Sequence, residues 1–285
     1  MHISLFLLSS IMAIFFITLS EKLSRKWMKN SFLIYGIMFS ITTIIVSAIY
    51  INEIKSPMRS TFAKNSQLDY DHLIRPKFRL HSHHNLKETV QLNAPLISQL
   101  PELPRGCEVT ALAMLLQYNQ IDAEKNELAR EVKKNPAQYS VTDEDIHFGN
   151  PHQGFVGDMY SFDTPGLGVY HEPIAELAAE YVDKNRVYDF TGESFTQILD
   201  QLNEGRPVWV IINATYKELS NDHFVTWLTD DGPIEITMRQ HSVLVTGYDH
   251  EYIYFNDPLQ RDSKAKINDF NAAWAQMGKQ AITIY

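Results

Sequence analysis

The sequence contains a single cysteine, Cys107, among its 285 residues. One cysteine excludes an intramolecular disulfide and excludes a zinc site built from several thiolates. Free cysteines are among the most buried residues, so a core position is the default interpretation unless a histidine partner can be found. Basic residues are also in deficit, because 25 Lys and Arg against 34 Asp and Glu give a net charge of −9. A chain this acidic shows no basic surface for nucleic acid, and we expect no such partner.

The sequence also lacks the motifs of common cofactor and metal sites. The glycines of 154–158 and 165–170 are not followed by Gly-Lys-Ser/Thr, and no strand clearly precedes them, so they do not form a phosphate-binding loop. The histidine-rich run 81–84 has no Cys or acidic residue to complete a metal site, so an exposed linker is the simpler interpretation. We therefore expect neither a cofactor nor a metal ion.

Two long uncharged runs lie near the N-terminus, Ile3–Leu19 and Ser31–Ile51. A membrane-spanning helix needs about 20 apolar residues, so the second run is long enough and the first is slightly short. The first run could instead be a signal peptide, but no basic residue precedes it and no small-residue cleavage site follows it. We predict a two-helix transmembrane hairpin over residues 1–52.

The charges around the two runs predict their orientation. The connecting segment Glu21–Asn30 carries four basic residues and one acidic residue, and the positive-inside bias places such a short loop in the cytoplasm. Both termini and the downstream domain are then predicted to lie outside the cell membrane. Three basic residues after the second run favour the opposite orientation: Lys55, Arg59 and Lys64. Residues 53–85 are polar and show no period, which predicts a linker.

Residues 86–285 show helical periodicity first and strand-like patterns later, which predicts an α+β domain. Helices are expected from Cys107 onward and over 123–134, 172–182, 194–203 and 267–277. Strands are expected over 207–213, 234–238, 242–248, 252–256 and 281–285, and residues 90–97 are expected to form a strand or an extended arm. The stretch 135–170 is long and rich in Gly, Asp and aromatic residues, and a long stretch of this kind is usually functional.

Cys107 lies where a helix is predicted to begin. The turn signal Pro104–Gly106 precedes it, and the apolar residues after it recur with helical spacing: Val109, Leu112, Ala113 and Leu116. Unpartnered backbone N–H groups and the positive end of the helix dipole both favour a thiolate there. We therefore predict that Cys107 is a nucleophile. Glu108 also favours a helix start, but a Glu108 side chain that points at the sulfur would oppose thiolate formation and weaken this assignment.

His241 and Asp257 supply the partners that a cysteine nucleophile needs. His241 opens an apolar strand, the next strand is predicted to end just before Asp257, and residues 249–251 form a tight turn between them. The start of one hairpin strand lies opposite the end of the next, so Asp257 can hold the imidazole. Asn256 points to the opposite side by strand alternation. The separation of 134 positions from Cys107 to His241 also fits the roughly 130–150 residues of papain-type enzymes.

Each of these residues alone has an ordinary structural interpretation, as a strand cap for His241 and an Asp-Pro turn for Asp257. Together with a cysteine at a helix start, they favour catalysis. The Cys107 N–H is one predicted oxyanion donor, and Gln99 is the candidate for the second, although a surface glutamine before a turn is nearly as good an interpretation. Residues of the long stretch are expected to line the substrate groove: Asp158, Tyr160 and His171.

Six motifs occur in order along the domain: Leu100–Thr110 (LPELPRGCEVT), Gly154–Tyr160 (GFVGDMY), Gly168–Pro173 (GVYHEP), Gly205–Val210 (GRPVWV), His241–Tyr248 (HSVLVTGY) and Asn256–Pro258 (NDP). Together they resemble the bacterial peptidase family 39-like domain, a group of papain-like cysteine peptidases related to the bacteriocin-processing peptidases. The resemblance runs from about Ala94 to the C-terminus. It implies a papain-like fold with Cys107 as nucleophile, His241 as base, Asp257 as the residue that orients the base, and Gln99 as an oxyanion donor.

The chain departs from the bacteriocin-processing members of that group. Those enzymes have a glutamine closer to the cysteine and an Asp-Cys-Gly sequence, whereas this chain has Gly106-Cys107-Glu108. They are also fused to a transporter with a nucleotide-binding domain, and this sequence has no Walker motif. The resemblance therefore does not imply specificity for double-glycine leader peptides.

The sequence thus predicts a membrane-anchored cysteine peptidase that hydrolyses peptide or isopeptide bonds outside the cell. Its expected partners are a peptide or protein substrate, such as a cell-wall peptide, and the membrane. Two alternatives remain open. One is a module on the same scaffold that binds a peptide or the cell wall without turnover. The other is a peptidoglycan amidase or acyl transferase that uses the same residues, because that chemistry differs only in the acceptor.

Overall fold

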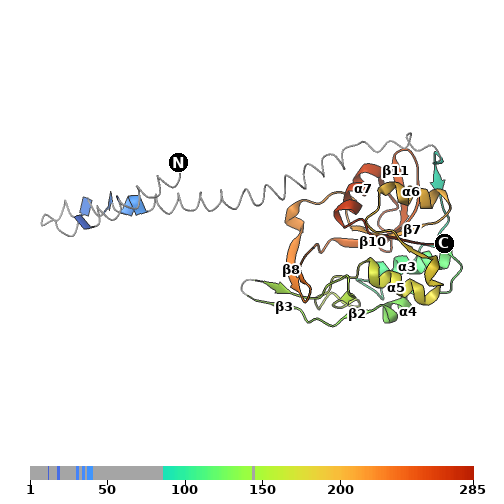
Figure 1. Ribbon diagram of the computed structural model, residues 1–285, viewed down its shortest axis with the longest axis horizontal. Helices are drawn as coiled ribbons and strands as arrows, with labels where there is room; N and C mark the ends of the chain where they lie inside the picture. Colours follow the sequence, from blue (N-terminus) through green and yellow to red (C-terminus); the bar gives the residue numbers. More distant parts are fainter. Residues whose placement is uncertain are drawn as a thin grey trace. The chain divides into compact units, whose positions relative to one another are not determined.

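The computed structural model describes residues 12, 18–19, 30–31, 34–35, 37–40, 86–142 and 145–285 (Figure 1). The chain divides into two units, Met1–Pro76 and Lys77–Tyr285. The described residues of the first unit are helical. None of the helices that the structure describes combines the length and the apolar character that a membrane crossing requires. The linker predicted over 53–85, and most of the two predicted spans, lie outside the described residues.

The second unit is built on a seven-stranded sheet whose strand pairs are all antiparallel. From edge to edge its strands are β12 (Lys264–Lys266), β11 (Tyr252–Asn256), β10 (Gln240–Tyr248), β7 (Val208–Asn213), β13 (Ala281–Ile284) and β6 (Val187–Asp189), while β1 (Val90–Gln91) pairs with β10. The predicted strands at β7, β10, β11 and β13 are confirmed. The one predicted over 90–97 shrinks to the two residues of β1.

Helices cover both faces of this sheet (Figure 1). One face packs against α3 (Cys107–Tyr118), with α4 (Lys125–Glu131) and α5 (His171–Tyr181) beside it, and the other against α6 (Phe195–Asn203) and α7 (Ile267–Gln276). Strand alternation sends side chains into both layers. In β7, Trp209 and Ile211 belong to the α3 core, whereas Val208, Val210 and Ile212 belong to the α6 and α7 core. The predicted α+β arrangement is therefore observed.

Helix α3 is buried more completely than its sequence pattern predicted. The spacing of its apolar residues predicted one buried face, but all ten residues from Cys107 to Leu116 are buried. The cause is its position between the sheet on one side and α4 and α5 on the other. A helix enclosed in this way is buried all round. The enclosure buries Glu108 as well, and the Trp209 indole donates a hydrogen bond of 3.0 Å to the Glu108 carbonyl.

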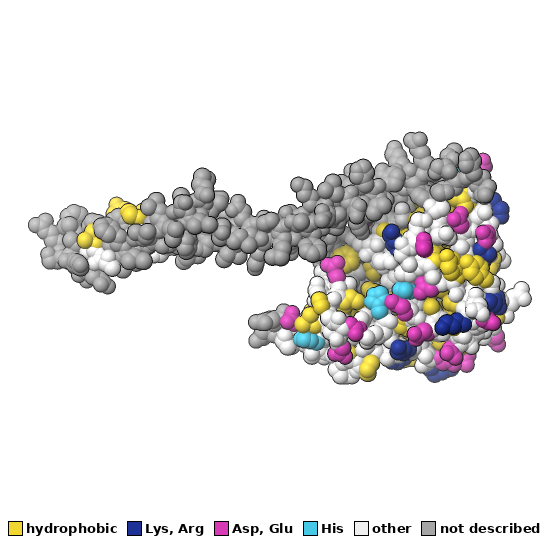
Figure 2. Space-filling model, viewed as in Figure 1, with side chains coloured by type: hydrophobic (Ala, Val, Ile, Leu, Met, Phe, Trp, Pro, Cys, Tyr) yellow, Lys and Arg dark blue, Asp and Glu magenta, His cyan; other side chains and the backbone are white. Residues whose placement is uncertain are grey.

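The long stretch predicted over 135–170 contains short strands. A four-stranded sheet joins β3 (Ser140–Val141), β4 (Ile146–His147), β8 (Val225–Thr229) and β9 (Gly232–Ile236), and β2 (Lys134–Asn135) pairs with β5 (Phe155–Val156). Two short 3-10 helices, η2 (Lys184–Arg186) and η3 (Asn221–His223), complete the elements described. The helix predicted over 123–134 is shorter at both ends than expected. Acidic and basic side chains are interspersed on the face shown in Figure 2.

Replacing Leu112 with Ala should destabilise the fold because the side chain is fully buried in α3. Leucine-to-alanine changes in such cores cost about 2–5 kcal/mol. The matched control is Leu96→Ala, at a side chain that is 56% exposed, where we expect a change within about 0.5 kcal/mol. Urea unfolding followed by tryptophan fluorescence measures both. Equal losses in the two variants would contradict the assignment of α3 to the core.

Candidate active site

The turn before α3 places Cys107 at the first position of the helix. Gly106 is its N-cap, and a Cβ at Gly106 would lie 2.5 Å from the Leu103 Cβ, so only glycine fits the turn. The Gln99 side chain holds the turn from inside, since its Nε2 donates to the carbonyls of Leu103 (3.0 Å) and Pro104 (2.8 Å). The backbone N–H of Gln99 donates to the Pro258 carbonyl at 2.9 Å. The segment before Cys107 is thereby tied to the residue that follows Asp257.

His241 and Asp257 meet in a buried hydrogen bond of 2.6 Å between Nε2 and Oδ1. Their exposures are 2% and 1%. Asp257 follows β11 directly and also accepts hydrogen bonds from the backbone N–H groups of Leu259 (2.8 Å) and Arg261 (3.1 Å). Burial alone would raise the pKa of the Asp257 carboxyl, but the bond and the charge of His241 and the two N–H groups lower it to about 2. Asp257 is therefore ionised at neutral pH.

The ionised Asp257 selects the tautomer of the neutral His241 ring. A carboxylate that accepts from Nε2 keeps the proton on that nitrogen, so in the neutral ring Nδ1 carries the lone pair of a base. The neighbouring Asn256 is directed elsewhere, because its Nδ2 donates to the carbonyls of Ala94 (3.0 Å) and Pro95 (2.8 Å). This difference between adjacent residues agrees with the alternation expected at the end of the hairpin.

The Cys107 sulfur makes its hydrogen bond to Glu108 Oε2, at 3.3 Å. The residues that the structure describes contain no hydrogen bond between Cys107 and His241. Burial raises the pKa of the thiol well above its ordinary value, and the charge of Glu108 and its hydrogen bond with the sulfur raise this pKa further. A backbone hydrogen bond from Ser242, the residue after His241, acts in the opposite direction. The sulfur thus lies beside the start of β10 but is directed toward Glu108.

The orientation of Glu108 is the arrangement that the sequence argument identified as adverse to the nucleophile. Its carboxyl is fully buried and accepts hydrogen bonds from Gln240 Nε2 (2.6 Å) and the Val169 N–H (3.2 Å) at Oε1. Burial raises the pKa of Glu108 to about 7, although these hydrogen bonds lower it. The neutral acid and the carboxylate are therefore comparably populated near neutral pH. Because the thiol and this carboxyl touch, their titrations are coupled.

Gly168 allows this carboxyl to be enclosed. Its φ of +150° lies in the region that favours glycine, and a Cβ at this position would lie 2.0 Å from Glu108 Oε1 and 2.5 Å from Gln240 Nε2. Sequence reasoning missed the role of Gln240. Its contact with Glu108 depends on the packing of α3 against β10, which local sequence pattern does not reveal.

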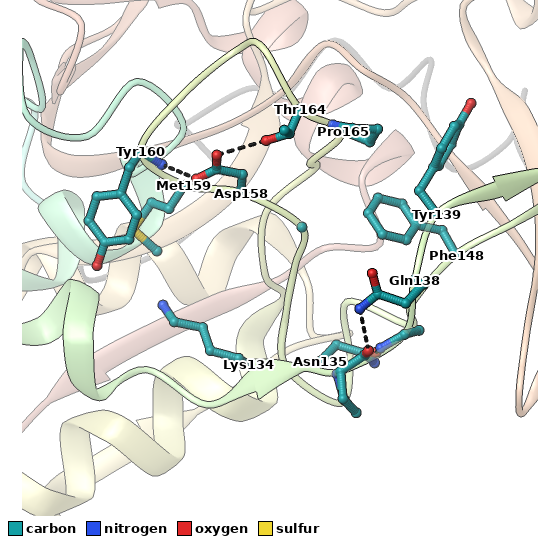
Figure 3. Close-up of a pocket in the computed structure, with 13 residues that line it drawn as sticks. Lys134, Asn135, Gln138, Tyr139, Phe148, Asp158, Met159, Tyr160, Thr164 and Pro165 are labelled. Carbon is teal, nitrogen blue, oxygen red and sulfur yellow. Dashed lines mark hydrogen bonds between the residues drawn. The ribbon is translucent and has the colours of Figure 1, made fainter.

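The structure separates the three residues predicted to line a substrate groove. Asp158 and Tyr160 line a cavity of about 610 Å³, in which the Asp158 carboxylate accepts from Thr164 Oγ1 (2.7 Å) and the Tyr160 N–H (2.8 Å). Figure 3 shows these two residues on one side of the cavity and Tyr139 and Phe148 on the other. His171 lines a different cavity. The two cavities are separate because α5 begins at His171 and directs its side chain toward β6, and a substrate groove lined by all three residues stays a prediction.

The larger cavity is linked to the turn that precedes Cys107. Arg105, two residues before the cysteine, donates from Nη1 to the carbonyls of Asp158 (3.1 Å) and Ser161. Its backbone N–H donates to the Met159 carbonyl at 3.0 Å. Sequence reasoning missed other residues that line this cavity: Lys134, Asn135, Gln138, Tyr139 and Phe148. They come from the short strands of the stretch 135–170 and its neighbours, whose pairing carries little signal in the sequence.

The chain matches known proteins over the same part that folds around the large sheet. The model of the Peptidase_C39 like family matches residues 91–282. The uncharacterized protein YvpB of Bacillus subtilis (strain 168) is 47% identical over 185 residues, which are 65% of this chain and 70% of the relative. A crystal structure of a protein assigned to the C39-like peptidases, from Bacillus anthracis, is 45% identical and aligns with a TM-score of 0.64 over 70% of this chain and 98% of that chain.

A more distant structure is a double-glycine-motif protease from an AMS/PCAT transporter, solved in complex with its leader peptide. It is 15% identical, with a TM-score of 0.37 over 68% of this chain and 92% of that chain, which is too distant to inform the chemistry of this site. The family match spans more than half of the sequence. The resemblance that the six motifs indicated is therefore confirmed. The chain belongs to the Peptidase_C39 like family.

Proposed function

We propose that this protein is a cysteine peptidase in which Cys107 is the nucleophile, His241 is the general base and Asp257 holds the imidazole. The observation that carries the proposal is the buried hydrogen bond of 2.6 Å between His241 and Asp257, located next to the strand position whose N–H reaches the Cys107 sulfur. A base held in one tautomer beside a thiol is the arrangement that thiol hydrolysis requires. Family membership supports the same class of enzyme.

In the proposed reaction, the sulfur exchanges its hydrogen bond to Glu108 for one to Nδ1 of His241. His241 takes the thiol proton, and the thiolate attacks the substrate carbonyl. The imidazolium then protonates the leaving amine, and water activated by the same imidazole releases the acyl group from the sulfur. Ionised Asp257 stabilises the imidazolium through both steps.

The oxyanion of this reaction needs hydrogen-bond donors near the sulfur. The Cys107 N–H is one of the four at the start of α3 that have no intrahelical partner. Gln99 is less well arranged as the second donor, because Leu103 and Pro104 accept from its Nε2. In this conformation Gln99 positions the turn, and its predicted role as a donor requires that one of these two bonds be released.

Glu108 determines when the thiolate can form. The ionised carboxylate repels a thiolate, whereas the neutral acid donates a hydrogen bond to it. A pKa of about 7 makes the neutral form available at neutral pH. We propose that the active form has a neutral Glu108, a thiolate at Cys107 and an imidazolium at His241. Activity should therefore fall as Glu108 ionises above neutral pH.

We further propose that the substrate is a peptide, cleaved at a peptide or isopeptide bond outside the cell by a domain anchored through the two apolar runs Ile3–Leu19 and Ser31–Ile51. The cavity of about 610 Å³ beside the Cys107 turn is large enough for side chains of such a peptide. Asp158 and Tyr160 would contact it there. Transfer to an acceptor other than water, as in an amidase or acyl transferase acting on peptidoglycan, would use the same three residues.

A second candidate function is peptide or wall binding without turnover. The observation in its favour is the direction of the Cys107 sulfur, which contacts Glu108 and not His241. The ionised and tightly held Asp257 favours the enzyme, because a binding module has no use for a fixed histidine tautomer. The two functions differ in whether Cys107 reacts faster than an ordinary thiol.

Cys107→Ala should abolish turnover of peptides by the full chain, and His241→Ala should lower the rate by about 10²–10⁴, the contribution of a general base. The assay compares mass spectra of a defined peptide library and of cell-wall fragments before and after incubation. His250→Ala is the control, since His250 lies in the turn after β10 and should leave the rate unchanged. Turnover that survives in Cys107→Ala would contradict the enzyme proposal, and products that contain an added acceptor would identify a transferase.

Glu108→Gln should lower the pKa of the Cys107 thiol, because it removes a buried negative charge and introduces an amide N–H near the sulfur. The rate of alkylation by iodoacetamide between pH 6 and about 10 measures this pKa. The control is Glu180→Gln, an exposed position on α5 that should leave the profile unchanged. A thiol pKa that rises or stays the same in Glu108→Gln would show that the carboxylate does not act on the sulfur.

A further inference from the structure

A group of two histidines and a carboxylate lies apart from the proposed catalytic residues. The His152 Nδ1 is 2.9 Å from both carboxylate oxygens of Glu172, and the His171 Nε2 is 3.2 Å from Glu172 Oε1. One ligand atom from each of the three residues lies within 4.8 Å of the other two. The ring centroids of the two histidines are 6.0 Å apart. Three donors therefore converge on one point without any change in the backbone.

The fold holds these three residues in place. His171 and Glu172 are the first two residues of α5, and the His171 N–H donates to Gln280 Oε1 at 3.0 Å. His152 lies on a turn that is fixed by the hydrogen bond of 2.9 Å from the Tyr170 N–H to the Pro151 carbonyl. The ring of Tyr170 packs edge-on against the ring of His152, with centroids 4.7 Å apart. The group is thus arranged before any ligand arrives, which lowers the cost of binding one.

Asp189 is a second, independent indication of a metal site. The His171 Nδ1 is 2.5 Å from Asp189 Oδ2 on β6, and the other Asp189 oxygen accepts from the Thr191 N–H at 3.0 Å. A carboxylate that accepts from one nitrogen of a histidine directs the lone pair of the other nitrogen outward, and this second contact is the usual companion of a metal-bound histidine. Here that other nitrogen is the Nε2 that faces Glu172.

The charge and the surroundings of the group also suit a divalent cation. Glu172 and Asp189 carry two negative charges, and the partial positive charge at the start of α5, about half a unit, opposes only part of them. The histidines line a cavity of about 220 Å³ that has room for a water molecule or a substrate group as a further ligand. Two imidazoles and one carboxylate, with an open position, form a donor set typical of zinc.

We propose that His152, His171 and Glu172 bind a Zn²⁺ ion, with Asp189 as the residue that orients His171. The site would also fix the segment that encloses Glu108, because Val169, two residues before His171, donates to the Glu108 carboxyl. This inference is independent of the peptidase proposal, since it uses none of the three catalytic residues. A salt-bridged cluster that binds only protons is the competing account of the same contacts.

The test is calorimetric titration of the metal-free full chain with ZnCl₂ at pH 8, because metal binding releases protons and is therefore favoured at higher pH. We expect one equivalent of Zn²⁺ to bind to the unmodified chain. His152→Ala and His171→Ala should each weaken that binding by more than tenfold, and Asp189→Asn should weaken it by about 10–100-fold, the usual effect of losing such a partner. Co²⁺ in place of Zn²⁺ should give visible absorption bands that the His152→Ala variant lacks.

The control variant is His83→Ala/His84→Ala, which removes histidines from the run 81–84 and should leave the stoichiometry and affinity unchanged. Far-ultraviolet circular dichroism of each variant excludes loss of folding as the cause of weaker binding. Zn²⁺ that binds equally well to His152→Ala and His171→Ala would overturn the proposal. Binding that disappears in the His83→Ala/His84→Ala control would also overturn it, because the ion would then belong to that run.

Discussion

The packing of the start of α3 against the start of β10 is the contact on which the site depends. Cys107 and Glu108 are the first two residues of α3, and Gln240, His241 and Ser242 are the first three of β10. The Gln240 amide binds the Glu108 carboxyl, and the Ser242 N–H binds the Cys107 sulfur. The Trp209 indole holds the Glu108 carbonyl from the neighbouring strand. The ends of α3 and β10 that carry Cys107 and His241 therefore pack against each other within the core.

This packing places a thiol and a carboxyl together where water is excluded. Burying one charged group is costly, and burying two adjacent groups of like charge costs more, so the pair favours states that carry at most one negative charge. Burial raises the pKa of Glu108 to about 7, and burial together with the charge of Glu108 raises the pKa of the thiol. In the proposed mechanism, the thiolate forms when Glu108 is neutral, so the carboxyl that opposes the nucleophile when ionised also controls it.

The elements that carry the site were largely predictable from the sequence, because each depends on short-range pattern. The helical spacing after Cys107 and the hairpin between His241 and Asp257 are local features, and both are observed. The orientation of side chains was less accessible. Glu108 is directed inward because α4 and α5 cover α3 from regions that lie further along the chain, and Gly168 opens the space for its carboxyl.

Longer-range contacts explain the remaining differences. Asp158 and His171 are close in sequence, but they lie at different cavities. His171 begins α5 and contacts Asp189 on β6, whereas Asp158 lines the larger cavity. Gln99 was expected to serve an oxyanion, yet its amide binds two carbonyls of the turn that its own segment forms. The four-stranded sheet was not predicted because it pairs β3 and β4, which precede α5 in the sequence, with β8 and β9, which follow α6. Strands of only two residues, such as β3 and β4, also give no periodic signal.

The most direct test of the central claim is the rate at which a peptidyl epoxide modifies Cys107 in the full chain, followed by intact-mass spectrometry. Opening of the epoxide requires attack by the sulfur and a proton from the imidazolium, so it reports on both proposed groups at once. We predict a single adduct on Cys107 that forms about 10²-fold more slowly in His241→Ala. An equal rate in the two proteins would contradict the proposed base, because Cys107 would then react as an isolated thiol.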